Sequence, residues 1–80
     1  MEVIVYSSNR CGFCAKQNEY LTENGVVFEE KDINNAVFFQ ELKELGGTGV
    51  PFTIVKKAGG NVSTIAGFDR EKLSEILIQQ

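Results

Sequence analysis

The sequence contains no histidine, no tryptophan, a single proline and two cysteines among its 80 residues. A structural zinc site needs four nitrogen, sulfur or oxygen ligands, which cysteine and histidine usually supply. Carboxylates, or a second copy of the chain, could complete such a site, but no spacing in the sequence indicates one. We therefore expect no bound metal.

Long apolar runs are also absent, since none approaches the ~18 residues of a membrane-spanning helix. The first residues, MEVIVYSS, contain no basic segment of the kind that begins a secretion signal. Acidic residues outnumber basic ones by 11 to 8, a balance that argues against nucleic acid binding. We expect a cytoplasmic protein with no nucleic acid or membrane partner.

What is present is an ordinary globular composition, with 42% hydrophobic residues and no linker or repeat. This predicts a single domain over residues 1–80, which we expect to be a monomer. Apolar periodicity and turn residues predict strands and helices in the order β-α-β-α-β-β-α. The predicted strands cover residues 3–6, 26–33, 51–55 and 62–66. The predicted helices cover residues 11–24, begin at Asn34 or Asn35 and end at 46–47, and follow Asp69 as N-cap.

This order predicts an α/β fold with a four-stranded mixed sheet flanked by helices. A strand, a crossover helix and a second strand favour a parallel pair. The short turn cluster KKAGGN favours an antiparallel hairpin between the last two strands. Cys11 then lies where the first strand leads into a helix, and Cys14 lies one turn further on.

The two cysteines, in the stretch SNRCGFCAK, could form a structural disulfide, bind a metal or perform redox chemistry. A disulfide that closes so short a loop removes little chain entropy, and the cytoplasm would reduce it. A thiolate at a helix N-terminus is favoured by unpaired backbone N–H groups and the helix dipole. We therefore favour a redox pair with Cys11 as nucleophile and Cys14 as the more shielded, resolving thiol.

The chain resembles the glutaredoxin family of the thioredoxin-fold superfamily over nearly its whole length. Three segments carry the resemblance: CGFC after the first strand, TGVP before the third strand and AGFD before the last helix. The resemblance implies a thioredoxin fold and a thiol–disulfide oxidoreductase that transports electrons and contributes to cell redox homeostasis. Its substrates would be protein disulfides or glutathione mixed disulfides, and a Cys11–Cys14 disulfide would form in each cycle.

The resemblance also implies a substrate-binding surface and a cis peptide bond between Val50 and Pro51. It implies that the Val50 backbone pairs with the substrate and that the helix start meets the γ-glutamyl end of glutathione. No tightly bound cofactor is implied, and glutathione would be a co-substrate. The implied binding residues are Thr48, Gly49, Val50, Pro51, Gly67, Phe68 and Asp69.

Two further residues are candidates for the substrate site on their own chemistry. Arg10 could hold a substrate carboxylate or favour the Cys11 thiolate, or it could be a solvated loop charge. Phe13 could line the substrate groove, or it could anchor the first helix in the core. The sequence leaves both pairs of interpretations open.

Departures from the family pattern leave the reductant open. Typical glutaredoxins carry lysine three residues before the first cysteine, where this chain has Ser8. The chain is also similar to small glutaredoxin-like redoxins that donate electrons to ribonucleotide reductase and are themselves reduced by thioredoxin reductase. The alternative from another class is an iron–sulfur cluster carrier, whose dimer would bridge a cluster through Cys11 and glutathione. A red-brown colour with visible absorbance would identify that carrier.

Overall fold

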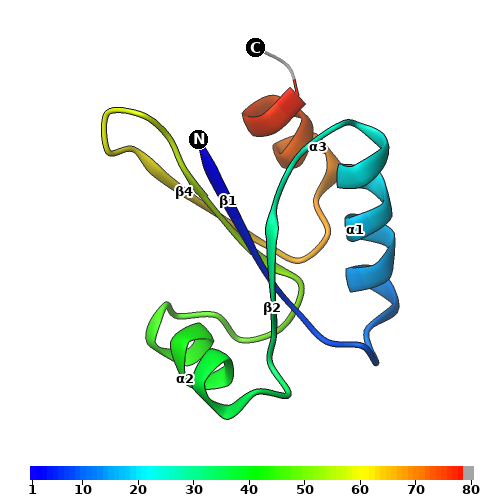
Figure 1. Ribbon diagram of the computed structural model, residues 1–80, viewed down its shortest axis with the longest axis vertical. Helices are drawn as coiled ribbons and strands as arrows, with labels where there is room; N and C mark the ends of the chain where they lie inside the picture. The colour runs from blue at the N-terminus through cyan, green and yellow to red at the C-terminus, as the bar shows by residue number, and fades with distance from the viewer. Residues whose placement is uncertain (79–80) are drawn as a thin grey trace.

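The protein is described from a computed structural model, in which the described residues are 1–78. Residues 79 and 80, which the predicted domain includes, lie outside the described residues. The predicted order of elements is confirmed (Figure 1). The strands are β1 (Glu2–Ser7), β2 (Glu29–Asp32), β3 (Phe52–Lys56) and β4 (Val62–Ala66); the helices are α1 (Gly12–Glu23), α2 (Ala36–Glu44) and α3 (Arg70–Leu73), which a π-helical turn, η1 (Ser74–Ile78), continues.

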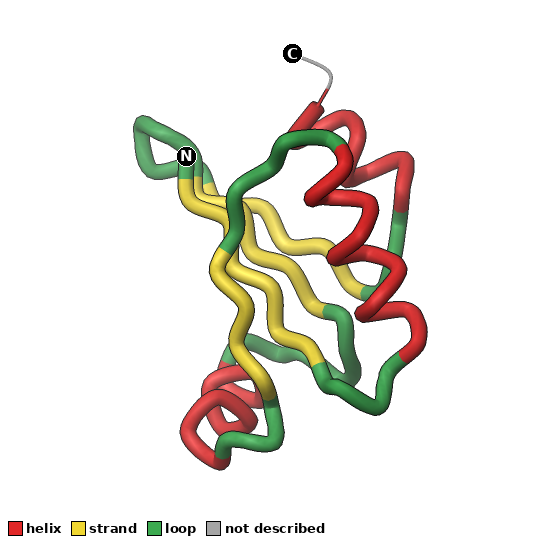
Figure 2. Tube along the Cα trace, turned by 45° about the vertical axis from the view of Figure 1, so that its right-hand side comes forward, coloured by secondary structure: helices red, strands yellow, loops and turns green. Residues whose placement is uncertain are grey.

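The four strands form one mixed sheet in the order β2-β1-β3-β4. β1 is parallel to β2 and antiparallel to β3, and β3 is antiparallel to β4, as the crossover and the hairpin predicted. α1 and α3 lie on one side of this sheet, and α2 lies near one end of its other side (Figure 2). The register of β1 with β2 places Ser7 opposite Asp32. The end of β2 therefore reaches the loop that precedes Cys11.

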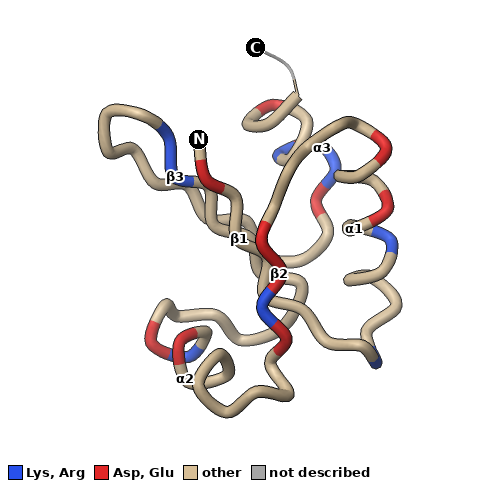
Figure 3. Tube along the Cα trace, in the orientation of Figure 1, with Lys and Arg blue, Asp and Glu red and all other residues tan. Residues whose placement is uncertain are grey.

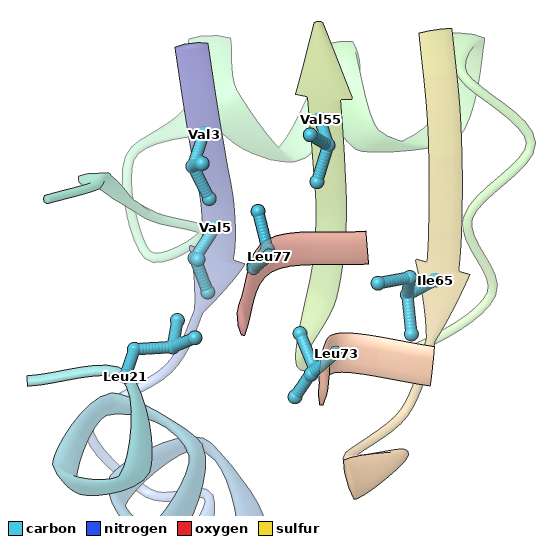
Figure 4. Close-up of a cluster of buried hydrophobic side chains, with 7 residues drawn as sticks. All are labelled: Val3, Val5, Leu21, Val55, Ile65, Leu73 and Leu77. Atoms are coloured by element: carbon cyan, nitrogen blue, oxygen red, sulfur yellow. The ribbon is translucent and has the colours of Figure 1, made fainter. Parts of the chain in front are cut away.

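β1 lies between β2 and β3 and is buried on both faces, because its successive apolar side chains alternate between two core clusters. Val3 and Val5 face α1 and α3 (Figure 4). Ile4 and Tyr6 face α2. The first cluster consists of Val3, Val5, Leu21, Val55, Ile65, Leu73 and Leu77, and the second of Ile4, Tyr6, Leu42, Phe52 and Ile54. α1 and α3 are thus fixed against the sheet that presents the cysteine loop.

β2 is shorter than the predicted strand over residues 26–33. The Val26 N–H donates to the Leu21 carbonyl at 2.9 Å and so belongs to the turn that ends α1. Val27 is 90% exposed, and β2 itself is a polar strand at the sheet edge with acidic residues along its length (Figure 3). β3 begins at Phe52, one residue later than predicted, because Pro51 has no N–H to donate to a sheet ladder.

Candidate active site

Cys11 is the N-cap of α1, so its sulfur lies at the positive end of the helix. Its backbone is extended, with φ −106° and ψ 113°, and its sulfur accepts a hydrogen bond from the Cys14 backbone N–H at 3.1 Å. The side chain is half-buried. The side chain of an N-cap residue normally accepts a hydrogen bond from one of the free N–H groups of the first turn, and here the acceptor is the Cys11 sulfur. This arrangement fixes the Cys11 sulfur at the helix start, where an approaching molecule can reach it.

Cys14 lies in the first turn of α1 with only 1% of its surface exposed. Burial, and after it the side-chain hydrogen bond with Cys11, raise the pKa of its thiol from 9.0 to about 12. The nearby Ser8 backbone acts in the opposite direction on this pKa but does not outweigh burial. A substrate can therefore reach Cys11, whereas Cys14 is buried behind it and stays protonated.

The peptide bond between Val50 and Pro51 is cis, which confirms the prediction made from the family resemblance. The Cys11 thiol donates to the Val50 carbonyl oxygen, with 3.6 Å between sulfur and oxygen. The Gly67 N–H donates to the Pro51 carbonyl oxygen at 2.8 Å. These contacts bring together the three segments that the sequence singled out, which are far apart along the chain.

The remaining predicted binding residues lie around this centre. Thr48 and Gly49 are exposed in the loop before Val50. Phe68 is half-buried against the core, with its ring centroid 6.0 Å from that of Tyr20. Asp69 is the N-cap of α3, as predicted, and its carboxylate accepts the Lys72 N–H at 3.1 Å. The side chain of Asp69 is therefore engaged within the protein.

Phe13 and Arg10, for which the sequence left two interpretations each, are both exposed. Phe13 is 62% exposed, which rules out its interpretation as a core anchor. The Lys16 ammonium nitrogen lies 5.5 Å from the centroid of its ring. The Arg10 side chain makes no hydrogen bond or ion pair within residues 1–78. The structure therefore gives Phe13 a contact beside the cysteines, with Lys16, and gives the Arg10 side chain none of these interactions.

The structure also shows a buried polar pair that sequence reasoning missed. The Gln17 amide nitrogen donates to the Thr53 hydroxyl at 2.7 Å, and both side chains are fully buried. The Gln17 carbonyl oxygen has no partner among the residues described. The signal was present in the sequence, because Cys14, Gln17 and Leu21 follow the spacing of one helix face. Because glutamine is polar, its residue type does not indicate that it belongs to that buried face.

A second missed residue is Glu30, on β2. One of its carboxylate oxygens accepts from the Ser7 hydroxyl at 2.7 Å and from the Asn18 amide at 2.5 Å. The alternation of side chains along a strand places Glu30 on the α1 side of the sheet and its neighbours Glu29 and Lys31 on the other. The sequence could not show that this edge strand ends beside the cysteine loop.

The described residues, 1–78, also bear on metal binding and on membrane crossing. No group of three or more histidine, cysteine, aspartate or glutamate residues is placed to hold a metal ion in this part of the chain. None of the helices within the same range has the length and apolar character that crossing a membrane requires.

Comparisons with known proteins agree with this geometry. A family model of glutaredoxin matches residues 3–58. Glutaredoxin 1 of Rickettsia felis is 36% identical over 58 residues, which cover 72% of this chain and 47% of that protein. The chain thus spans about half the length of this curated relative.

Solved structures give the same fold. The thioredoxin-like protein BC3987 has a TM-score of 0.76 at 29% identity, over 95% of this chain and 100% of that one. The glutaredoxin-like NrdH-redoxin of Escherichia coli has a TM-score of 0.81 at 18% identity, over 95% of both chains. These likenesses confirm the predicted thioredoxin fold. With the family model matching most of its length, the chain belongs to the glutaredoxin family.

Proposed function

We propose that the protein is a thiol–disulfide oxidoreductase that reduces protein disulfides or glutathione mixed disulfides through Cys11 and Cys14. The observation that carries this proposal is the hydrogen bond from the Cys14 backbone N–H to the Cys11 sulfur at the start of α1. It holds the sulfur of the accessible cysteine at the helix start, and the thiolate of such a cysteine is the attacking species in disulfide exchange. Membership of the glutaredoxin family supports the same reaction.

The reaction consists of two exchanges. The Cys11 thiolate attacks one substrate sulfur, the substrate disulfide breaks, and the first substrate thiolate leaves and takes up a proton. Cys14 then loses its proton and attacks the Cys11 sulfur of the mixed disulfide, which releases the second substrate thiolate. The substrate gains two electrons and the protein is left with a Cys11–Cys14 disulfide. An external reductant restores the two thiols by the reverse chemistry.

We assign substrate contact to the surface around Cys11 and the cis bond. Val50 is half-buried, and its carbonyl oxygen contacts the Cys11 thiol. An extended substrate segment that pairs with the Val50 backbone would therefore lie beside the reacting sulfur. Phe13 supplies an exposed aromatic surface, and Thr48 and Gly49 lie exposed in the adjoining loop.

The start of α3, with Gly67, Phe68 and Asp69, is the proposed place for the γ-glutamyl end of glutathione. Backbone N–H groups at the start of a helix suit a carboxylate. Glutathione is the proposed co-substrate, and Arg10, in the loop before Cys11, is the proposed partner of a substrate carboxylate. We propose that the protein acts as a monomer in the cytoplasm, where thiols are kept reduced.

Asymmetric trapping tests the assignment of nucleophile and resolving thiol. Cys14→Ser and Cys11→Ser are each incubated with an excess of a disulfide substrate, quenched with acid and weighed intact by mass spectrometry. We expect Cys14→Ser to accumulate the mixed disulfide, because Cys11 keeps its place at the helix start and no resolving thiol remains. Cys11→Ser should trap little, because Cys14 is buried. Equal adducts, or more adduct on Cys14, would reverse the assignment.

A paired turnover assay identifies the reductant. One arm supplies glutathione with glutathione reductase, and the other supplies thioredoxin reductase, with the same disulfide substrate in both. Turnover in the first arm is expected from the proposed glutathione site. Turnover in the second arm alone would assign the chain instead to the redoxins that serve ribonucleotide reductase.

A further inference from the structure

Gln17 and Thr53, the buried polar pair, lie on the two elements that carry the candidate active site. Gln17 is on α1, whose N-cap is Cys11. Thr53 is on β3, which follows the cis peptide bond between Val50 and Pro51. The Gln17 amide nitrogen donates to the Thr53 hydroxyl at 2.7 Å. Within residues 1–78, this is the only hydrogen bond that joins α1 to β3.

The surroundings of Thr53 suit an apolar side chain. Thr53 is opposite Val5 on β1 and opposite Ile65 on β4, and all three residues are fully buried. Val5 and Ile65 belong to the core cluster that lies between the sheet and the helices α1 and α3 (Figure 4). Side chains of directly opposite residues share one face of a sheet, so Thr53 is a polar residue within an apolar layer. Valine, which has nearly the same shape, would fit there.

Stability does not account for this pair. The Gln17 carbonyl oxygen is buried and has no partner among the residues described. A buried acceptor without a hydrogen bond destabilises a fold, whereas replacing both partners of a pair by apolar groups of similar shape is nearly neutral or stabilising. Local choices that lower stability in this way are expected where they serve function. The role of the pair therefore follows from the elements that it connects.

The pair lies at similar distances from the two halves of the candidate site. Gln17 is six residues after Cys11, which is about 9 Å along a helix that rises ~1.5 Å per residue. Thr53 is three residues after Val50, which is about 10 Å along an extended chain at ~3.3 Å per residue. At the site itself, the Cys11 sulfur lies 3.6 Å from the Val50 carbonyl oxygen. The two segments are thus joined at two points, and the buried hydrogen bond fixes how Cys11 is placed against Val50.

We propose that Gln17 and Thr53 are positioning residues that align the Cys11 sulfur with the Val50 backbone, and that they thereby favour extended peptide disulfides over small disulfides. This inference rests on the proposed function, in which an extended substrate segment pairs with the Val50 backbone. A substrate held at Val50 depends on the alignment of Cys11, because a small misplacement of reacting atoms removes much of the rate. A small disulfide that does not pair with Val50 has no such dependence.

The test compares disulfides that release the same coloured thiopyridone. One is dipyridyl disulfide, and the other is a short peptide whose central cysteine carries a pyridyl disulfide. In the peptide, the Cys11 thiolate bonds to the cysteine sulfur, the disulfide bond breaks, and thiopyridone leaves with its electron pair, since the thiol of lower pKa leaves faster. A second peptide has N-methylated backbone amides on both sides of its cysteine. It therefore lacks the N–H groups that pair with a backbone.

The double variant Gln17→Leu and Thr53→Val should react with dipyridyl disulfide at the wild-type rate. It should react with the unmethylated peptide about tenfold more slowly than the wild type does. With the N-methylated peptide, the two proteins should have equal rates. Thr53→Ser keeps the hydroxyl that accepts from Gln17, so it should react with every substrate as the wild type does. Gln17→Met, which has a side chain of similar length but no amide, is a second variant and should show the same loss with the unmethylated peptide.

Asn24→Ala is the matched control. It removes a side-chain hydrogen bond to the Tyr20 carbonyl on the same helix, at the end far from Cys11, and should leave all rates unchanged. The proposal is overturned if the double variant and Gln17→Met react with the unmethylated peptide as fast as the wild type, or if they slow dipyridyl disulfide equally. A loss in Thr53→Ser as large as in the double variant also overturns it. Absence of thiopyridone release from dipyridyl disulfide by the wild type would instead contradict the proposed function.

Discussion

The alkaline stability of the reduced protein is expected to depend on Cys14. Its pKa is raised from 9.0 in an exposed thiol to about 12 in the folded protein, chiefly by burial. A group whose folded pKa is raised contributes stability that is complete below its unfolded pKa and lost as pH rises toward the folded one. Between pH 9.0 and about pH 12, the wild type should lose stability through this thiol.

The size of the effect follows from the two pKa values. Each pH unit in that interval costs about 1.4 kcal/mol, so the full interval costs about 4 kcal/mol. A domain of 80 residues has a free energy of unfolding of roughly 4–12 kcal/mol, at ~0.05–0.15 kcal/mol per residue. Ionisation of this one buried thiol therefore removes between about a third and all of that free energy of unfolding at high pH.

Urea unfolding of the reduced wild type and of Cys14→Ala, from about pH 8 to about pH 11, measures this dependence. Other alkaline groups titrate in both proteins, and their effects cancel in the comparison. The wild type should lose about 1.4 kcal/mol more per pH unit than the variant above pH 9.0. Cys11→Ala, which keeps the buried thiol, should retain most of the wild-type slope. Parallel curves for the wild type and Cys14→Ala would refute the reasoning.

Three further predictions address the site and its supports. Cys11→Ser should reduce a disulfide substrate no faster than the dithiothreitol background in a steady-state assay, and wild-type activity in this variant would contradict the mechanism. The double substitution Gln17→Leu and Thr53→Val removes a buried side-chain carbonyl that lacks a hydrogen-bond partner. It should stabilise the protein by about 1 kcal/mol, which raises the melting temperature by about 4–8 °C. A lower melting temperature would show that the polar pair is needed for stability. Asn35→Ala removes the side chain that accepts the Val37 N–H at the start of α2 and should cost about 1 kcal/mol in urea unfolding, whereas an unchanged midpoint would argue against this cap.

Local sequence signals predicted most of the fold. The buried strand, the cap at Asp69 and the hairpin each depend on contacts between residues that are near in sequence, or on side-chain periodicity. The exact extent of β2 could not be predicted in this way. Val26 and Val27 favour a strand by composition, but the turn that ends α1 uses the Val26 N–H and leaves Val27 in solvent.

The candidate site was predictable to different degrees. The place of Cys11 at a helix start follows from the strand that precedes it and the helix that follows. The cis bond before Pro51 does not follow from chain physics, which favours trans, and was predicted from the family resemblance alone. Glu30 could not be predicted, because its place beside Cys11 depends on how an edge strand is registered against β1.

The central claim, that Cys11 and Cys14 together transfer two electrons to a disulfide, has a direct test. The reduced wild type is mixed with a small excess of a neutral disulfide, quenched with acid, and its peptides are mapped by mass spectrometry while the released thiol is counted. The predicted products are a Cys11–Cys14 disulfide and two thiols released for each protein molecule. Two unmodified cysteines, or a stable adduct on Cys14, would contradict the claim.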